Sequence, residues 1–243
     1  MKTFLKQFLK YYLKFFTKLA LIIHKPYVIA IAGSTNKTFV KESIKNTLKG
    51  MNFSVRANPK NFNTEIGLPL SILSLGSGYN SYKNWLPIIY KTPFSIFKQF
   101  PQYLVLELGV SDKGDMKYLL SIIKPKIFII TDISQRYLEG FSGMDHLVDE
   151  YINLAKNSKK NNYLILNQDN SRIRKISKYS KAKLIYFGIK NEADYRAKNV
   201  KETGEGQSFI IKSKGKEKEH FIKRYGEHHI YSFLISTVVK DIL

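Results

Sequence analysis

Short runs of consecutive apolar residues, separated by stretches with helical periodicity, dominate the middle of this chain. Unbroken apolar strands are typical of parallel sheets that helices cover on both faces. We therefore predict an α/β fold with a doubly wound, mostly parallel sheet. The candidate strands are residues 28–32, 53–57, 104–108, 127–131, 163–166 and 184–187, and the candidate helices between them are 37–48, 115–123 and 144–157.

The first 25 residues follow a different pattern, with lysine at every fourth position and aromatic or aliphatic residues between. This repeat predicts a basic amphipathic helix over residues 1–25 that carries too much charge to span a bilayer. We expect it to lie on an anionic membrane surface, as in a cytoplasmic protein held at the inner face of the membrane. The alternative is a helix that packs on the protein's own domain or on a partner.

Two further segments stand apart from the strand–helix alternation. Aromatic residues and prolines gather in an insertion at residues 76–102. This insertion is either a second membrane-facing or lid-like element, or a satellite core that covers a sheet edge. Residues 208–212 and 220–223 flank a polar run, which predicts a β-hairpin, and a final apolar helix is expected over residues 230–243.

The amino-acid composition indicates the size of the domain, excludes cysteine-based sites and favours partners of negative charge. The chain has 243 residues, 44% of them hydrophobic, which suits one large α/β domain with an appendage. No cysteine occurs, which excludes disulfides and thiolate metal sites. The net charge of +21 favours anionic partners, but nucleic acid is not expected, because no helix-turn-helix, zinc pattern or RNP-like motif is present.

The strongest local signal is the segment 28–38, which reads VIAIAGSTNKT. An apolar strand, a small-residue turn and a Lys-Thr pair are typical of a phosphate-binding loop, whose helix start offers N–H groups to an anion. The lysine of such a loop reaches the outer phosphates and the threonine binds Mg²⁺. Glycine normally precedes the lysine, where this chain has Asn36; since asparagine tolerates a left-handed backbone, we predict that the turn survives. An ordinary strand–turn–helix with a solvated lysine is the alternative.

Several blocks, in order along residues 26–240, resemble the central ATP-binding domain of the Mur ligase family, closest to the D-alanyl-D-alanine-adding (MurF-like) branch. The resemblance implies such a domain over residues 26–243, with a P-loop-like nucleotide site and with ATP and Mg²⁺ as cofactors. It also implies ATP-dependent amide formation through an acyl phosphate, on a UDP-muramoyl-peptide of peptidoglycan synthesis. The blocks are AGSTNKT at 32–38, NFNTEIGLPL at 61–70, LVLELG at 104–109, TDI at 131–133, LNQD at 166–169 and GEHH at 226–229.

The same resemblance assigns roles to individual residues. Lys37 and Glu107 are the expected catalytic residues, and Thr38 and Glu107 the expected metal ligands. Threonine and glutamate are apt ligands, since Mg²⁺ prefers oxygen. The remaining assignments are Asn63 and Glu65 on the substrate side, and Gly33, Ser34, Thr35, Asn36, Lys37, Thr38, Asn167, Asp169, His228 and His229 around the nucleotide.

Some positions depart from the family pattern. Tyr137 stands where the family has a metal-binding histidine, and Tyr151 where family members carbamylate a lysine to bind a second Mg²⁺. We expect Glu150 or Asp149 to supply the missing carboxylate and include Glu150 among the metal ligands. The substitutions near the nucleotide are Asn36, Asp132 and His229.

The resemblance covers only the central domain of the family. We expect the N-terminal and C-terminal domains to be absent from this sequence. Because domain closure normally completes such a site, either a protein partner supplies them, or the chain is a truncated gene product or a degenerate relative of the family. The alternative function is a non-catalytic, membrane-associated nucleotide-binding or scaffold protein derived from the family.

Overall fold

The computed structural model describes residues 2–79, 81–135, 141 and 143–243 and confirms the predicted α/β fold. The strands are β1 (Tyr27–Ala32), β2 (Val55–Ala57), β3 (Tyr103–Glu107), β4 (Ile127–Ile130), β5 (Tyr163–Asn167), β6 (Lys183–Gly188), β7 (Tyr195–Thr203), β8 (Gly206–Ser213) and β9 (Lys216–Ile222). The helices are α1 (Lys2–His24), α2 (Lys37–Gly50), α3 (Gly67–Ile72), α4 (Tyr82–Ser95), α5 (Asp115–Leu120), α6 (Met144–Asn157), α7 (Ser171–Ile176) and α8 (Glu227–Ile242).

Within the described residues the strands form a nine-stranded sheet in the order β2-β3-β1-β4-β5-β6-β7-β8-β9. Neighbouring strands from β2 to β7 are parallel, whereas β7, β8 and β9 pair antiparallel. Strand β1 lies between β3 and β4, so the strand order reverses there. Parallel α/β sheets bind ligands outside the carboxyl ends of their strands at such a reversal.

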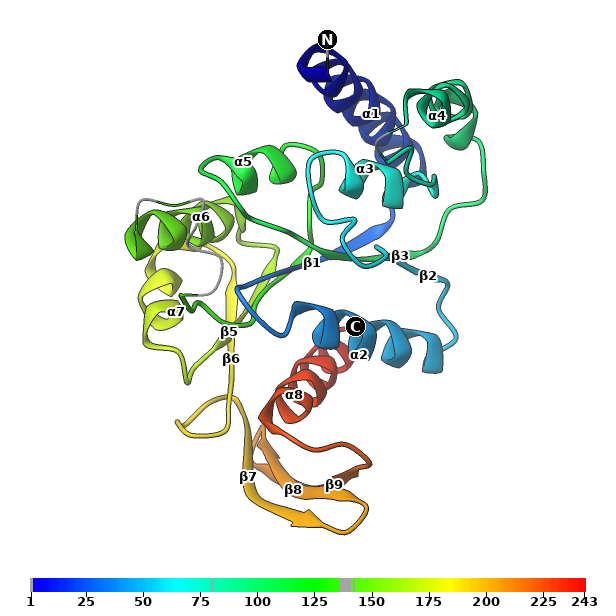
Figure 1. Ribbon diagram of the computed structural model, residues 1–243. Coiled ribbons are helices and arrows are strands. Elements are labelled where there is room, and N and C mark those ends of the chain that lie inside the picture. The colour runs from blue at the N-terminus through cyan, green and yellow to red at the C-terminus, as the bar shows by residue number, and fades with distance from the viewer. Residues whose placement is uncertain (1, 80, 136–140, 142) are drawn as a thin grey trace.

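Alternate residues of the central strands face two different helical layers. Ile29 and Ile31 point into a core with α2 and α8, which pack against each other. Ala30 and Ala32 point into a second core with α5, α6 and α7, and Figure 1 shows these helices on the opposite face of the sheet from α2 and α8. Burial on both faces is why these strands are continuous apolar runs rather than alternating ones.

The structure extends the predicted strands at the C-terminal side of the sheet. Strand β7 was not predicted, and β8 and β9 take in most of the polar run expected to be a turn, leaving Lys214 and Gly215 between them with positive φ angles of 50° and 74°. The exposed strand β9 reads KEKEHFI, and the outer half of β7 is exposed as well. Such strands lack the apolar signal on which the prediction depended.

Helix α1 and the insertion at 76–102 join α3 in a satellite core. Leu9 and Leu13 of α1 are buried against Trp85 and Ile88 of α4, and the Tyr12 hydroxyl donates to the carbonyl of Ile89 at 2.9 Å. Figure 1 shows α1 and α4 side by side, away from the main sheet. Helix α1 therefore packs on the protein's own domain, and the insertion contributes to a satellite core. That this core covers an edge of the sheet stays a prediction.

The lysine row of α1 contributes to this docking. Lys6 forms an ion pair with Glu65 at 2.9 Å, and the ammonium groups of Lys10 and Lys14 lie 4.0 and 4.6 Å from the ring centroid of Tyr118. Three of the five lysines in this row therefore contact the protein itself. In the described part of the chain, no helix combines the length and apolar character needed to cross a bilayer.

If α1 is an integral part of the fold, replacing a buried side chain of α1 by alanine should lower the free energy of unfolding, whereas replacing an exposed one should not. Leu13 is fully buried, so Leu13→Ala should lower the free energy of unfolding by about 2–5 kcal/mol. Phe15, two residues after Leu13, is 62% exposed, so Phe15→Ala should change the free energy of unfolding by less than about 0.5 kcal/mol. Urea unfolding measures both; equal small effects would contradict the docking.

Candidate nucleotide-binding site

The loop between β1 and α2 is a tight turn with positive φ angles at Gly33 and Asn36. Gly33 has a φ of 143°, and a Cβ there would overlap Thr131 Oγ1, so no larger residue fits. Asn36 precedes α2 with a φ of 64°, the left-handed conformation that glycine normally supplies at this point. The prediction that the turn survives the replacement of glycine by Asn36 is confirmed.

Hydrogen bonds fasten this loop to the chain that follows β4. The Ser34 N–H donates to the Asp132 carbonyl at 2.7 Å, and the Thr131 hydroxyl donates to the Thr35 carbonyl at 2.6 Å. The Asp132 carboxylate accepts from the Thr35 hydroxyl at 3.1 Å and from the Asn170 side chain at 2.7 Å. Asp132, at a position where the family has asparagine, thus braces the loop.

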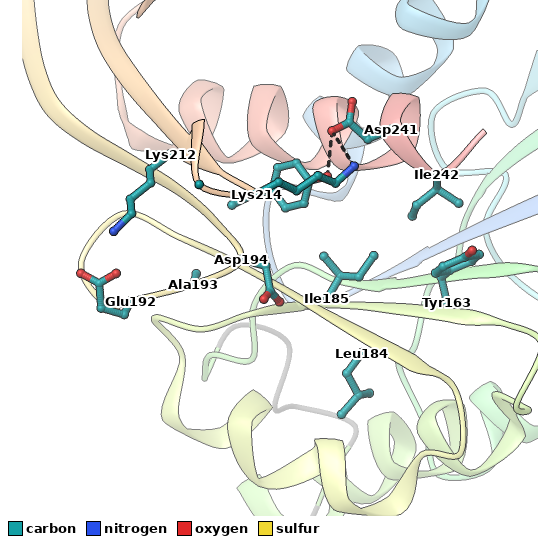
Figure 2. Close-up of a pocket in the computed structure, with 12 residues that line it drawn as sticks. Tyr163, Leu184, Ile185, Glu192, Ala193, Asp194, Lys212, Lys214, Asp241 and Ile242 are labelled. Atoms are coloured by element: carbon teal, nitrogen blue, oxygen red, sulfur yellow. Dashed lines mark hydrogen bonds and ion pairs between the residues drawn. The ribbon is translucent and has the colours of Figure 1, made fainter. Parts of the chain in front are cut away.

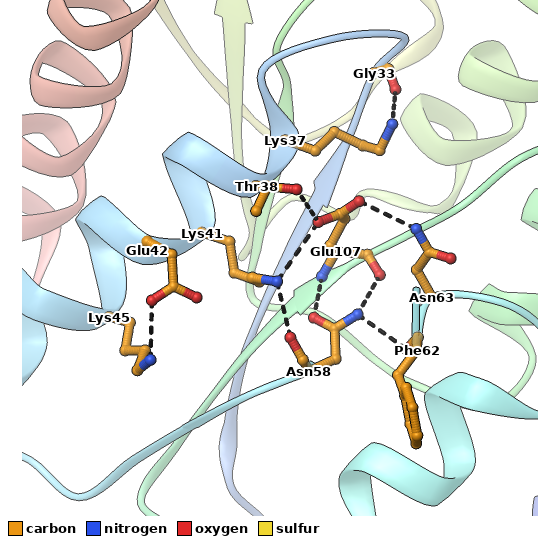
Figure 3. Close-up of polar contacts among 10 residues, drawn as sticks. All are labelled: Gly33, Lys37, Thr38, Lys41, Glu42, Lys45, Asn58, Phe62, Asn63 and Glu107. Carbon is orange, nitrogen blue, oxygen red and sulfur yellow. Dashed lines mark hydrogen bonds and ion pairs between the residues drawn. The ribbon is translucent and has the colours of Figure 1, made fainter. Parts of the chain in front are cut away.

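The Glu107 carboxylate, at the end of β3, is the polar centre beside this loop (Figure 3). Its Oε2 accepts from the Thr38 hydroxyl at 2.9 Å and lies 3.6 Å from Lys41 Nζ, and its Oε1 accepts from Asn63 Nδ2 at 3.1 Å. The Asn58 side chain bonds both the N–H and the carbonyl of Glu107, at 2.8 and 3.0 Å. Three segments of the chain therefore meet at Glu107: the end of β3, the first turns of α2 and residues 58–63.

Two of these partners, Lys41 and Asn58, were not among the predicted site residues. Lys41 is 2% exposed, and its ammonium also donates to the Asn58 carbonyl at 2.8 Å. Its position one residue after the buried Val40 and three before the buried Ile44 places a lysine on the apolar face of α2. A charge on the buried face of a predicted helix is a sequence signal for a buried ion pair.

Lys37 occupies the first turn of α2, as predicted for the loop lysine. Its ammonium donates to the Gly33 carbonyl at 2.7 Å, so the side chain folds back over the loop, as Figure 3 shows. The structure thus brings Lys37, Thr38, Glu107 and Asn63 together, as the sequence predicts.

The two histidines at the start of α8 lie against Phe39 of α2. The ring centroids of Phe39 and His228 are 4.6 Å apart, and those of Phe39 and His229 are 5.1 Å apart. Burial lowers the pKa of His229, and the neighbouring His228 and Arg224 lower it further. A neutral imidazole beside a half-exposed phenyl ring forms a small aromatic surface next to the loop.

Asn167 and Asp169, at the end of β5, mainly bond to the protein itself. Asn167 donates to the Thr131 carbonyl at 2.9 Å. The Asp169 carboxylate accepts from the Ile189 N–H at 2.6 Å and from the Tyr231 hydroxyl at 2.8 Å, which ties the loop after β6 to α8. Burial works to raise the pKa of Asp169, but these hydrogen bonds outweigh it and hold the pKa below its usual value.

Glu150 and Glu65 also have partners within the fold. The two carboxylate oxygens of Glu150 accept from the N–H groups of Gly114 and Met116, both at 2.8 Å, and so cap the start of α5. Glu65 is tied to α1 through Lys6. The role of Glu150 as a metal ligand, and that of Glu65 on the substrate side, stay predictions that these contacts do not favour.

Tyr137 and Tyr151 stand at the two positions where the resemblance implies metal-binding residues. Tyr137 lies outside the described residues. Tyr151 is buried, and burial raises its pKa despite the neighbouring Ser34 hydroxyl, so the side chain is a neutral phenol at physiological pH. A neutral phenol is a poor ligand for Mg²⁺.

A cavity of about 590 Å³ lies at the opposite end of the strands from the loop (Figure 2). It is bordered by the start of β5 at Tyr163, by the start of β6, and by the last turn of α8, where Asp241 bonds Tyr195 and pairs with Lys214. Its lining mixes both signs of charge. The residues of the β1–α2 loop do not line it.

The fold and the loop define an α/β protein with a phosphate-loop-like turn at the reversal of its strand order. The family model of the Mur ligase middle domain matches residues 31–240, and the chain belongs to the Mur ligase family. This membership confirms the predicted resemblance and accounts for the order of the sequence blocks.

Individual relatives agree with this assignment. The UDP-N-acetylmuramoyl-tripeptide--D-alanyl-D-alanine ligase of Haemophilus influenzae is 26% identical over 221 residues, which cover 88% of this chain and 42% of that protein. The enzyme of the same name from Bacillus subtilis is 27% identical over 203 residues, covering 84% of this chain and 38% of that protein. The chain therefore spans about two fifths of the length of these curated relatives.

Solved structures confirm the fold. MurF ligase from Thermotoga maritima, in complex with ADP, superimposes with a TM-score of 0.78 at 23% identity, covering 95% of this chain and 48% of that one. MurF from Acinetobacter baumannii gives a TM-score of 0.75 at 18% identity, covering 95% of this chain and 45% of that one.

The left-handed backbone at Asn36 leads to a stability prediction. Alanine is strained in this conformation by roughly 1–2 kcal/mol, whereas glycine adopts it freely. We expect Asn36→Ala to lower the free energy of unfolding by about 1 kcal/mol and Asn36→Gly to leave it unchanged or raise it slightly. Thermal unfolding of both variants measures this, and equal losses would contradict the observed turn.

The hydrogen bonds of Asp169 lead to a pH-dependent prediction. Because its folded pKa is depressed, this carboxylate stabilises the fold above the unfolded pKa of about 3.9, and the stabilisation is lost as the pH falls through the folded pKa. Asp169→Asn should therefore cost about 1–3 kcal/mol near pH 7, and the difference should shrink below about pH 4.

The control for Asp169 is Asp149→Asn, since Asp149 is exposed on α6. Urea unfolding at several pH values should show a change within about 0.5 kcal/mol for this control. A loss for Asp169→Asn that is independent of pH would mean that the carboxylate charge is not what stabilises the loop.

Proposed function

We propose that this chain is the nucleotide-binding part of an ATP-dependent amide ligase of the MurF-like branch. The single observation that carries the proposal is the pairing of Thr38 and Glu107 at 2.9 Å, beside a turn in which Asn36 reproduces the left-handed glycine of a phosphate loop. Family membership and the ADP complex of a related fold support ATP as the nucleotide.

The loop and the first turn of α2 offer what a polyphosphate needs. N–H groups at a helix start favour an anion, and the Lys37 ammonium is close enough to the loop to donate to its Gly33 carbonyl. In the nucleotide complex we expect this ammonium to exchange the carbonyl for phosphate oxygens. Such neutralisation of phosphate charge is the main contribution that proteins make to phosphoryl transfer.

The donor set beside the loop fits Mg²⁺. Thr38 Oγ1 and Glu107 Oε2 are adjacent oxygens, and Mg²⁺ is usually held by one or two protein oxygens together with phosphates and water. Among the described residues, no group of three or more His, Cys, Asp or Glu side chains is placed to hold a metal ion. The bound ion would neutralise charge on the phosphates; Lys41, Asn58 and Asn63 keep the Glu107 carboxylate in place.

We assign the base of the nucleotide to the aromatic surface of Phe39, His228 and His229. The three rings lie within 5.1 Å of one another by centroid, and Phe39 is 47% exposed. Aromatic rings with an exposed face suit stacking of a purine. Asn167 and Asp169 act in this proposal as supports of the surrounding loops.

The reaction proposed for the complete enzyme has two steps. A phosphoryl group passes from ATP to a substrate carboxylate, which releases ADP, and an amine then displaces phosphate to form the amide. A UDP-muramoyl-peptide is the proposed carboxylate substrate, in line with the names of the relatives. Because this chain matches only about two fifths of those enzymes, a protein partner or a further part of the polypeptide is proposed to contribute the other domains.

Binding of Mg·ATP, measured by calorimetry, tests the nucleotide site. The chain should bind Mg·ATP, and Lys37→Ala should weaken binding by at least tenfold, because a charge-assisted phosphate contact contributes about 1.5–3 kcal/mol. Glu107→Gln should weaken Mg·ATP binding while changing binding of metal-free ATP much less.

Lys45→Ala is the matched control, since Lys45 lies two turns further along α2 and pairs with Glu42 at 2.9 Å. It should leave the affinity unchanged. No binding at millimolar Mg·ATP would contradict the proposal and favour the non-catalytic scaffold as the function.

A further inference from the structure

The outer face of α1 carries a stripe of apolar side chains that no described element covers. Its members recur at helical spacings of three, four and seven, on the side of α1 opposite the buried Leu9 and Leu13. A helix that packs against its own domain normally turns polar residues outward. The stripe consists of Phe4, Phe8, Tyr11, Phe15 and Ile22, and Phe4 is 79% exposed.

Helix α4 and the residues after it carry a second stripe of the same kind. Leu86, Tyr90 and Phe94 follow one another at intervals of four, and Phe97 continues the line with 80% of its surface exposed. The inner side of α4 is buried against α1 through Trp85. We call the two stripes together the aromatic face.

The two stripes belong to one rigid unit. The Tyr12 hydroxyl of α1 donates to the Ile89 carbonyl of α4, and His24 at the end of α1 stacks on Phe100 with ring centroids 4.6 Å apart. The His24 ring also bonds the Ile96 carbonyl at 2.7 Å. Exposed apolar stripes on two packed helices mark an interaction site.

The positive charge around the aromatic face indicates which partner binds it. No acidic residue occurs in residues 1–40 or 67–106, the stretches that build the aromatic face, whereas exposed Lys18, Lys83, Lys91 and Lys98 lie within them. A second copy of the same face would set lysines against lysines. An anionic lipid surface meets both properties, because aromatic rings favour the interfacial region of a bilayer and lysines are attracted to acidic headgroups.

We infer that the aromatic face of α1 and α4 together is a docking surface for an anionic membrane. This surface differs from that of an isolated amphipathic helix on a membrane. The inner apolar side of α1 and the lysines Lys6, Lys10 and Lys14 contact the protein itself and are not available to lipid. Loss of nucleotide binding would leave this surface intact, so this inference and the proposed function fail separately.

The test is co-sedimentation of the full chain with vesicles of phosphatidylcholine, with or without phosphatidylglycerol. The chain should bind the anionic vesicles and bind the neutral ones at least tenfold more weakly, and added salt should reduce the binding. Phe15→Ser and Phe94→Ser should each lower the partition coefficient by about tenfold, the effect expected when one aromatic side chain is lost from the interface.

Phe221→Ser is the matched control, because Phe221 is 47% exposed on β9, at the other end of the sheet. It should bind vesicles like the unmodified chain. Loss of binding in Phe15→Ser but not in Phe94→Ser would overturn the two-helix surface. Equal binding to neutral vesicles, or self-association that Phe94→Ser abolishes while vesicle binding is absent, would overturn the anionic membrane as the occupant.

Discussion

The Glu107 carboxylate joins the sheet, helix α2 and the 58–63 segment at one buried point. Its charge is compensated by the Lys41 ammonium at 3.6 Å and by hydrogen bonds from Thr38 and Asn63. A buried carboxylate without such partners is strongly destabilising, so the loop, the start of α2 and the end of β3 must keep their relative positions. The same constraint places the Thr38 and Glu107 oxygens, which we propose as Mg²⁺ ligands, beside the loop that we propose binds phosphate.

The sequence predicts most of the fold because burial on two faces leaves a distinct pattern. Strands such as 28–32 and 127–131 are continuous apolar runs, and the helices between them have one apolar side. The prediction was incomplete where that signal is weak: β7 and β9 are largely exposed, and α4 contains Pro87 and Pro93, which argue against a helix. The local sequence of such a segment does not show whether it pairs in the sheet or packs as a helix, because this depends on contacts with residues that are distant in the chain.

The site was predicted in part. Lys37, Thr38, Glu107 and Asn63 meet because the carboxyl ends of parallel strands and the helix after β1 converge at the reversal of strand order. Asn58 could not be found from its neighbours in sequence, since its contact with Glu107 joins the ends of β2 and β3, which are neighbours in the sheet but 49 residues apart in the chain. Asp169 and Glu150 match family positions or their neighbours, yet their oxygens cap loops and a helix here, which only the packing of α8 and α5 reveals.

The most direct test of this account is a crystal structure of the chain with Mg²⁺ and a non-hydrolysable ATP analogue. The account predicts that the phosphates lie against the 33–36 turn, that Lys37 leaves the Gly33 carbonyl for a phosphate oxygen, and that a metal ion lies beside Thr38 and Glu107. A nucleotide bound elsewhere, or a soaked crystal in which Thr38 and Glu107 keep their direct hydrogen bond and the turn stays empty, would contradict it.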